Sequence, residues 1–138
     1  MITYHENDLS PAEVDRIRAA VGWSALPEGQ LAKALAACAY SVAAHQQGQP
    51  VGMARLVGDG VYYLLCDVAV LPACQGQGVG RELVRRAVDF ARRGLREGQR
   101  CSITLVSAKG KEPFYRSLGF ASIPGDRAGD GMQLLLTR

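Results

Sequence analysis

The sequence contains no apolar run long enough to cross a membrane. Its longest apolar-leaning stretch, residues 34–44, is interrupted by Tyr40 and Ser41, whereas a membrane-spanning helix needs about 18 or more apolar residues. The first residues also lack the basic region and the following apolar region of a secretion signal. We therefore expect no membrane segment and a cytoplasmic location.

Metal-ligating residues are few and poorly spaced. The four cysteines are separated by 28, 8 and 27 residues, no C-x-x-C pair occurs, and only two histidines are present. Zinc sites in proteins use closely spaced Cys and His pairs, so we expect no metal. We interpret Cys38, Cys66 and Cys101 as reduced core thiols, and Cys74 as inert although it lies beside the glycine-rich turn described below.

The excess of positive charge is also small. The formal net charge is +3, which suits a small polyanionic ligand but falls short of the basic stripe interleaved with aromatic residues that is typical of nucleic-acid binding. We expect no nucleic-acid partner. The 138 residues and the hydrophobic share of 48% predict one globular domain over residues 1–138.

Hydrophobic periodicity divides the chain into alternating strands and helices. We expect a helix that begins at Ser10 and Pro11, and a long, apolar and therefore central strand at residues 61–71. The predicted elements form an α/β domain with one mixed sheet of about six to seven strands and flanking helices. Further strands are expected at residues 2–5, 40–44, 51–57, 101–106, 120–123 and 132–137, and further helices at residues 28–38, after residue 80 to residue 93, and at residues 109–117.

A glycine-rich segment, residues 75–81, directly follows the long strand. Gly76, Gly78 and Gly80 alternate there, and glycines allow left-handed dihedrals and a close approach to the backbone. The next helix leaves its first N–H groups unpaired at the positive end of its dipole. The segment therefore predicts a phosphate or pyrophosphate site.

Two common phosphate motifs do not fit this segment. A P-loop requires Lys and then Ser or Thr after the last glycine, but Arg81 and Glu82 occupy those positions. A dinucleotide fingerprint requires a third glycine where Arg81 stands and an acidic residue about 20 positions later, where Arg100 is found. The P-loop interpretation is excluded, and the dinucleotide interpretation is weak.

A third pattern does fit. Gln75, Gly78 and Gly80 match Q-x-x-G-x-G after the strand valine Val70, and this arrangement resembles the acetyl-CoA signature of the GNAT acetyltransferase superfamily. Residues 113–120, Pro-Phe-Tyr-Arg-Ser-Leu-Gly-Phe, resemble that family's F-Y-x-x-x-G-F segment. The resemblance covers roughly residues 50–137, and two motifs in this order are more specific than either alone.

The resemblance implies a GNAT-like domain with a splayed pair of parallel strands, and acetyl-CoA as the cosubstrate. Backbone N–H groups of residues 75–81 are expected to bind the pyrophosphate, and the edge groups of Val68 and Val70 to pair with the pantetheine arm. The expected cofactor-binding residues are Val68, Ala69, Val70, Gln75, Gly76, Gln77, Gly78, Val79, Gly80 and Arg81.

Two residues are candidates for catalysis. Tyr115 is the tyrosine of the F-Y-x-x-x-G-F segment, and the resemblance implies that it protonates the leaving thiolate; the alternative is a core aromatic beside Phe114. Asp67 lies in an apolar stretch of strand, where an unpaired carboxylate is costly. It could accept the amine proton, hold a cationic acceptor, cap backbone groups or pair with Arg55.

The implied reaction is attack of a primary amine on the thioester. A small-molecule amine is the expected acceptor, with an amino sugar phosphate or a protein amine as alternatives, and a non-catalytic acyl-CoA-binding module as the alternative outside enzymes. Trp23 and Asp126 are the candidate substrate-binding residues, although Trp23 could pack helices and Asp126 could lie in a solvated loop. A homodimer is possible, as it is common in this superfamily.

Overall fold

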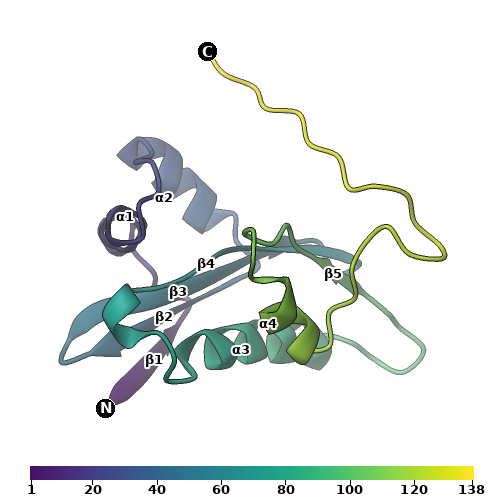
Figure 1. Ribbon diagram of the computed structural model, residues 1–138, viewed down its shortest axis with the longest axis horizontal. Helices are drawn as coiled ribbons and strands as arrows, with labels where there is room; N and C mark the ends of the chain where they lie inside the picture. Colours follow the sequence, from purple (N-terminus) through teal and green to yellow (C-terminus); the bar gives the residue numbers. More distant parts are fainter. The chain divides into compact units, whose positions relative to one another are not determined.

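A five-stranded mixed sheet organises residues 1–105 of the computed structural model, which describes all residues 1–138 (Figure 1). Residues 106–138 form a second compact unit, which is described separately below. The strands are ordered as they occur in the chain; the first four are antiparallel and the last pair is parallel. They are β1 (Ile2–Glu6), β2 (Tyr40–Gln46), β3 (Gln49–Gly58), β4 (Tyr62–Val70) and β5 (Ser102–Thr104).

Helices cover both faces of this sheet (Figure 1). Two helices, α1 (Pro11–Ala20) and α2 (Glu28–Ala36), lie on one face, and α1 packs against β3 and β4. The long α3 (Val79–Arg93) packs against β2, β3 and β4 on the other face. The α/β class and the flanking helices predicted from the periodicity are therefore confirmed.

The start of α1 is fixed by a capping box. Ser10 Oγ accepts a hydrogen bond from the backbone N–H of Glu13, and the Glu13 carboxylate accepts one from the backbone N–H of Ser10. Pro11 occupies the first helical position, where its missing N–H costs nothing. The predicted helix start is confirmed.

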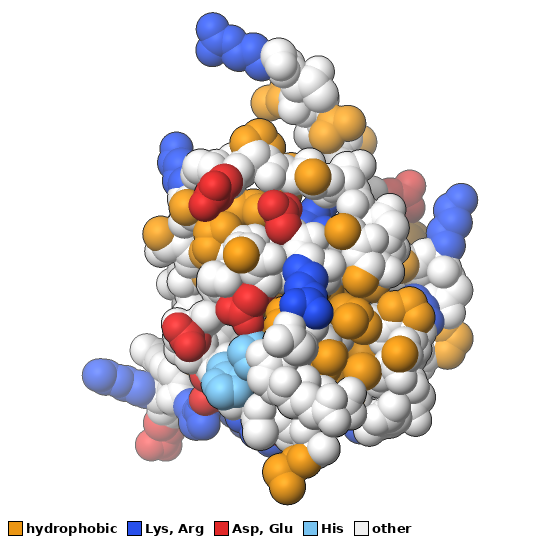
Figure 2. All heavy atoms as spheres, turned by 90° about the vertical axis from the view of Figure 1, so that its left-hand side faces the viewer, with side chains coloured by type: hydrophobic (Ala, Val, Ile, Leu, Met, Phe, Trp, Pro, Cys, Tyr) orange, Lys and Arg blue, Asp and Glu red, His pale blue; other side chains and the backbone are white.

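The two histidines gather beside this helix start, on the face shown in Figure 2. His45 Nε2 lies 2.5 Å from Glu13 Oε2, and the rings of His5 and His45 are 4.4 Å apart between centroids. Burial opposes ionisation of Glu13, but hydrogen bonds from His45 and Ser10 outweigh it and hold the pKa of that carboxyl below its usual range. The contact ties α1 to β2.

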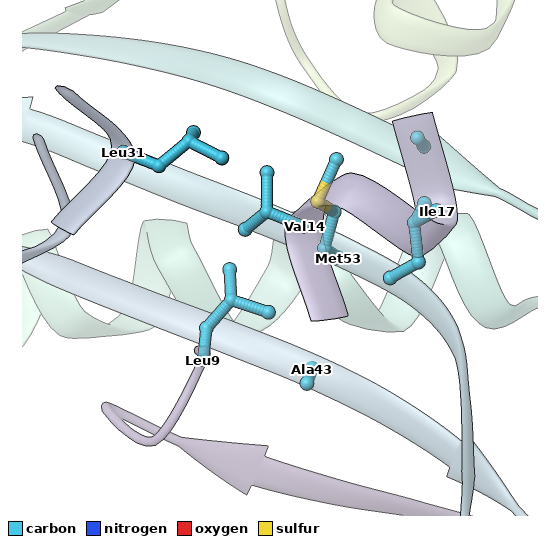
Figure 3. Close-up of a cluster of buried hydrophobic side chains, with 7 residues drawn as sticks. Leu9, Val14, Ile17, Leu31, Ala43 and Met53 are labelled. Carbon is cyan, nitrogen blue, oxygen red and sulfur yellow. The ribbon is translucent and has the colours of Figure 1, made fainter. Parts of the chain in front are cut away.

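The core under α1 and α2 consists of side chains from every element on that face (Figure 3). Val14 and Ile17 of α1 and Met53 of β3 are completely buried, and Leu31 of α2 is nearly so. Met53 lies in the middle strand of the sheet. It belongs to the same cluster as the buried apolar residues of α1 and α2. Leu9, Ala43 and Ala69 complete the cluster.

Two expectations about the sheet were wrong. Residues 61–71 were expected to form the central strand, but β3 is the middle strand and β4 is the fourth. Residues 120–123 and 132–137 were expected to be strands, but neither segment has regular secondary structure, so the sheet has five strands rather than six or seven. A segment with strand propensity forms a strand only when a neighbouring strand supplies hydrogen bonds.

The second unit, residues 106–138, contains one short helix, α4 (Glu112–Ser117). It is shorter than the predicted helix over residues 109–117 because Lys109 and Gly110 form a turn, and Gly110 has a φ of 86°. Gly119, with a φ of 95°, follows its end, as glycine commonly does after helices. None of the helices in either unit combines the length and apolar character needed to cross a membrane.

We predict that Gly58→Ala destabilises the turn that joins β3 to β4. A Cβ at residue 58 would overlap the Tyr62 carbonyl oxygen and lie 2.6 Å from Tyr63 Cδ1, both in the adjoining strand. Overpacking of this kind costs about 1–3 kcal/mol, so urea denaturation should show a loss of about 2 kcal/mol in the free energy of unfolding.

Gly29→Ala is the matched control, because Gly29 lies in α2 and a Cβ added there would meet no atom within 4 Å. It should raise the free energy of unfolding by up to about 1 kcal/mol, since alanine favours helices. Equal stability of the two variants would contradict the assigned β3–β4 turn.

Candidate functional site

The loop after β4 has open space beside its glycines. A single 3₁₀ turn, η1 (Pro72–Cys74), leads from the strand into the loop. Gly76 and Gly78 then adopt left-handed φ values of 76° and 82°, and a Cβ at either would meet no protein atom within 4 Å. The two glycines are thus needed for backbone conformation, and the space beside them is open.

The N-terminus of α3 opens onto this loop. Gly78 is its N-cap residue, and no side chain caps the helix. The first turn, which carries Val79, Gly80 and Arg81, therefore presents backbone N–H groups at the positive end of the helix dipole. Helix N-termini of this kind commonly bind anions, and binding of a pyrophosphate at this one stays a prediction.

A glycine in β3 lets α3 lie close to the sheet. A Cβ on Gly52 would stand 3.1 Å from Leu83 Cδ1 and 3.4 Å from Val79 Cγ1, both in α3, and 3.2 Å from the Ala69 carbonyl oxygen in β4. The missing side chain therefore allows the start of α3 to pack directly beside the end of β4. Hydrophobic periodicity did not indicate this role for Gly52.

Strands β4 and β5 pair only at their beginning. The parallel register joins Tyr62, Tyr63 and Leu64 to residues 102–104, and β4 then continues to Val70 without a partner on that side. The backbone polar groups along that part of the edge have no strand partner. The parallel pair that the family resemblance implied is therefore present, and it is short because β5 ends at Thr104.

The direction of these polar groups follows from the other edge of β4. The N–H of Leu71 donates to the Val51 carbonyl of β3 at 2.8 Å, so the alternation along a strand turns the polar groups of Val70 and Val68 toward the open edge. A hydrogen bond from Gln75 supports this orientation of Val70, because Gln75 Nε2 donates to the Val70 carbonyl at 2.9 Å. The same hydrogen bond anchors the glycine loop to the end of the strand. The side chain of Ala69, between Val68 and Val70, is buried in the core.

A β-bulge interrupts β4 in its middle. Met53 of β3 pairs with Ala69, and Arg55 pairs with Cys66, so two residues of β4 stand opposite one of β3. Asp67, the first of the two, has a φ of 53°, which is rare for a residue other than glycine. The bulge turns the Asp67 side chain toward the face covered by α1.

Asp67 is held there by two arginines. Arg55 Nε donates to Asp67 Oδ2 at 2.8 Å, and Arg18 Nη1 of α1 donates to Oδ1 at 3.3 Å. All three side chains are only 14% exposed. Pairing with Arg55 was one of the alternatives that the sequence left open for Asp67, and it is present; a role for Asp67 as the general base stays a prediction.

Arg18 joins Asp67 to Trp23, the candidate substrate-binding residue. Its guanidinium carbon lies 5.5 Å from the Trp23 ring centroid, and its Nε donates to the Ser24 carbonyl at 2.9 Å. Sequence reasoning missed Arg18, because a single arginine on an amphipathic helix looks like any solvated residue. Only the fold brings it to a strand residue 49 positions later.

Two thiols, Cys38 and Cys66, lie beside this cluster. Arg55 Nη1 donates to Cys38 Sγ at 3.3 Å. Burial raises the pKa of Cys66 to about 11, although the charge of Arg55 opposes the shift. Cys74 beside the loop is 4% exposed, with Sγ 3.5 Å from Gln46 Oε1, which agrees with the inert role expected for it. All four cysteines are free.

The guanidinium of Arg55 carries a positive charge. Burial alone would lower the pKa of Arg55, but its hydrogen bonds to Cys38 and Asp67 and the charge of Asp67 outweigh burial and raise that pKa. The site at the bulge therefore carries two guanidinium groups against one carboxylate.

Tyr115 and Asp126 belong to the second unit. Tyr115 lies in α4 and packs its ring edge to face with Phe114 and Phe120, at centroid distances of 5.0 and 5.9 Å. Burial raises the pKa of Tyr115 above its usual value, so the phenol stays protonated at neutral pH. Asp126 is exposed in the loop that follows α4. Neighbouring aromatic rings therefore fix the side chain of Tyr115, whereas the side chain of Asp126 is exposed to solvent.

Comparison with known proteins identifies the family. The profile of the acetyltransferase (GNAT) domain matches residues 36–122. A serotonin N-acetyltransferase from rice, named as chloroplastic, is 34% identical over 84% of this chain and 58% of its own length. The chain spans about half to two thirds of the length of the first curated relatives that it matches.

Solved structures show the same fold. A GNAT family acetyltransferase from Streptococcus pneumoniae is 27% identical with a TM-score of 0.82, and the match covers 100% of both chains. A GNAT family acetyltransferase from Brucella melitensis, solved in complex with acetyl-CoA, is 26% identical with a TM-score of 0.66 over 94% of both chains. The family profile matches well over half of the residues, and the fold and the glycine-rich loop agree with that match. This chain therefore belongs to the GNAT acetyltransferase family.

Proposed function

We propose that this chain transfers the acetyl group of acetyl-CoA to the primary amine of a small molecule. The observation that carries the proposal is the junction between the open edge of β4 and the glycine loop that leads into α3. It combines a backbone edge that has no strand partner, although Gln75 Nε2 donates to the Val70 carbonyl there, with an uncapped helix N-terminus. Such a junction offers hydrogen bonds to an extended amide-containing arm and to a pyrophosphate together.

The residues present fit coenzyme A. The pyrophosphate would contact backbone N–H groups of residues 75–81, where the missing Cβ atoms of Gly76 and Gly78 leave open space. The amide groups of the pantetheine arm would pair with the edge groups of Val68 and Val70. Arg81, in the first turn of α3, adds positive charge on this side. When bound, acetyl-CoA supplies the thioester whose acetyl group is transferred.

Tyr115 is proposed as the general acid. A phenol that stays protonated can donate its Oη proton to the departing sulfur, and the raised pKa keeps Tyr115 in that form. The ring contacts with Phe114 and Phe120 fix the direction of the side chain within its unit.

Asp67 is proposed to act through its ion pairs. Each of its carboxylate oxygens already accepts a hydrogen bond from a guanidinium, so Asp67 is arranged to hold Arg18 and Arg55 at the bulge. Trp23 and Asp126 remain the proposed contacts for the acceptor. The cytoplasmic location, the single domain over residues 1–138 and the possible homodimer also stay predictions.

The cofactor assignment is tested with Gly78→Val. Valine at a φ of 82° is strained, and its side chain would enter the space assigned to the pyrophosphate. We expect the Kd for coenzyme A, measured by titration calorimetry, to rise at least about tenfold, which corresponds to about 1.4 kcal/mol.

Gly98→Val is the matched control for backbone strain. Gly98 has a φ of 79° and no neighbour within 4 Å of its Cβ position, but it follows α3 rather than preceding it. Its affinity for coenzyme A should stay at the wild-type value. If both variants bind coenzyme A equally well, the pyrophosphate does not lie at the loop.

Tyr115→Phe should lower kcat by about 100-fold or more and leave the Kd for coenzyme A unchanged, since only the proton donor is lost. Because burial raises the pKa of Tyr115, its protonated form persists beyond the pH at which an ordinary phenol ionises. Wild-type kcat should therefore show no decline from Tyr115 below that pH. Release of free coenzyme A with a panel of amines measures kcat and its pH dependence, and titration calorimetry measures the Kd.

The exposed Tyr62 provides the control, because Tyr62→Phe removes a hydroxyl from a side chain that is 71% exposed. It should keep wild-type kcat. A Tyr115→Phe enzyme with normal turnover would remove Tyr115 from the chemistry. If no amine causes release of coenzyme A while the wild-type chain binds it, the protein is an acyl-CoA-binding module instead.

The variant Asp67→Asn distinguishes a role of Asp67 in ion pairing from a role in proton transfer. Removing one partner of a buried ion pair costs about 3 kcal/mol, so we expect a clear drop in the free energy of unfolding while the pH–rate profile keeps its shape. A profile that loses its acidic limb in this variant would instead assign Asp67 as the general base.

A further inference from the structure

The cluster at the bulge carries more positive than negative charge. Arg18 and Arg55 both pair with Asp67, and no second carboxylate contacts either guanidinium. One guanidinium is enough to compensate one carboxylate. The cluster therefore keeps a net positive charge on side chains that are only 14% exposed, and an uncompensated charge with so little solvent is costly.

Both guanidinium groups also keep unused donors. Arg18 uses Nε on the Ser24 carbonyl and Nη1 on Asp67, and Arg55 uses Nε on Asp67 and Nη1 on Cys38. Nη2 of each arginine makes no hydrogen bond within the chain. Because a guanidinium offers five N–H donors in a fixed plane, unused donors on two neighbouring groups suit a carboxylate or a phosphate.

The position of the cluster connects it with the proposed reaction. Asp67 lies three residues before Val70 in β4, and hence about 10 Å along the strand from its end. The open edge beside Val68 and Val70 is where the pantetheine arm is proposed to lie. An acceptor that approaches the thioester from the α1 side of the sheet would meet Arg18, Trp23 and Arg55 first.

We propose that Arg18 and Arg55 bind an anionic group, a carboxylate or a phosphate, that the acceptor carries next to its amine. The inference rests on the proposed function and narrows its substrate class to zwitterionic or phosphorylated small amines. The same positive charge disfavours cationic peptides, because like charges repel where solvent screening is weak. The Trp23 ring lies beside Arg18, with the guanidinium carbon 5.5 Å from the ring centroid.

Matched pairs of acceptors test the proposal without any variant. Phenylalanine and phenethylamine differ by one carboxylate, and phosphoethanolamine and ethanolamine differ by one phosphate. The anionic member of at least one pair should show a kcat/KM at least about tenfold higher, since a charged hydrogen bond is worth about one to two orders of magnitude. The pair that responds distinguishes carboxylate from phosphate. Equal values in both pairs overturn the proposal.

Arg18→Gln then identifies the binding group. It should abolish the preference for the anionic member mainly through KM, while the Kd for coenzyme A is unchanged. Arg16→Gln is the matched control, because Arg16 lies on the same helix, is exposed and contacts Gln49 rather than the cluster. A preference that survives Arg18→Gln, or disappears equally in Arg16→Gln, overturns the assignment.

A binding measurement separates this inference from the proposed function. Phenylpropionate and glycerol phosphate carry the anion but no amine, and should raise the Tm of the wild-type chain saturated with coenzyme A but not that of Arg18→Gln. That result supports the anion site even if no amine is acetylated, in which case only the catalytic proposal fails. If neither anion shifts the wild-type Tm and neither acceptor pair shows a preference, the anion site is absent.

Discussion

The loss of pairing between β4 and β5 after Leu64 is the constraint on which the site depends. A sheet that stayed closed would satisfy the backbone of β4 internally and leave nothing for a ligand. Here β5 is only three residues long, so β4 runs on to Val70 with one edge open. Because unpaired backbone groups are costly to bury, the open edge is stable only where solvent or an extended ligand supplies hydrogen bonds. The short β5 therefore leaves main-chain groups of β4 without a strand partner.

The bulge at Asp67 adds side-chain chemistry to that surface. A left-handed residue in the middle of a strand is unfavourable by about 1 kcal/mol or more, and the surrounding structure must compensate it. Two guanidinium groups do so by holding the Asp67 carboxylate from opposite elements, β3 and α1. The strain at residue 67 thus fixes Arg18 at the surface of the sheet, and couples the position of α1 to the shape of β4. Helix and strand would shift together if the bulge were removed.

Local patterns in the sequence predicted the parts of this fold whose cause is local. The capping box at Ser10, the glycine loop and the amphipathic α3 all follow from residues within one element. Strands depend on partners, and residues 120–123 and 132–137, which were expected to be strands, do not form strands in the structure. The candidate site divides in the same way. Gly76 and Gly78 were predictable from spacing, whereas Arg18 reaches Asp67 only because α1 crosses β3 and β4.

The two positive features of the first unit lie at different points along β4 and differ in kind. At the end of the strand, the charge comes from a helix dipole and main-chain N–H groups, which cannot be titrated and act on any phosphate within reach. At the bulge, the charge comes from two side chains whose donors have a fixed planar geometry. A backbone site recognises a feature common to all ligands of one kind, and a side-chain site can change by substitution without disturbing the sheet. The proposed cofactor loop is part of the fold, whereas Arg18 is a polar residue of α1 whose replacement leaves the capping box and the apolar core of that helix intact.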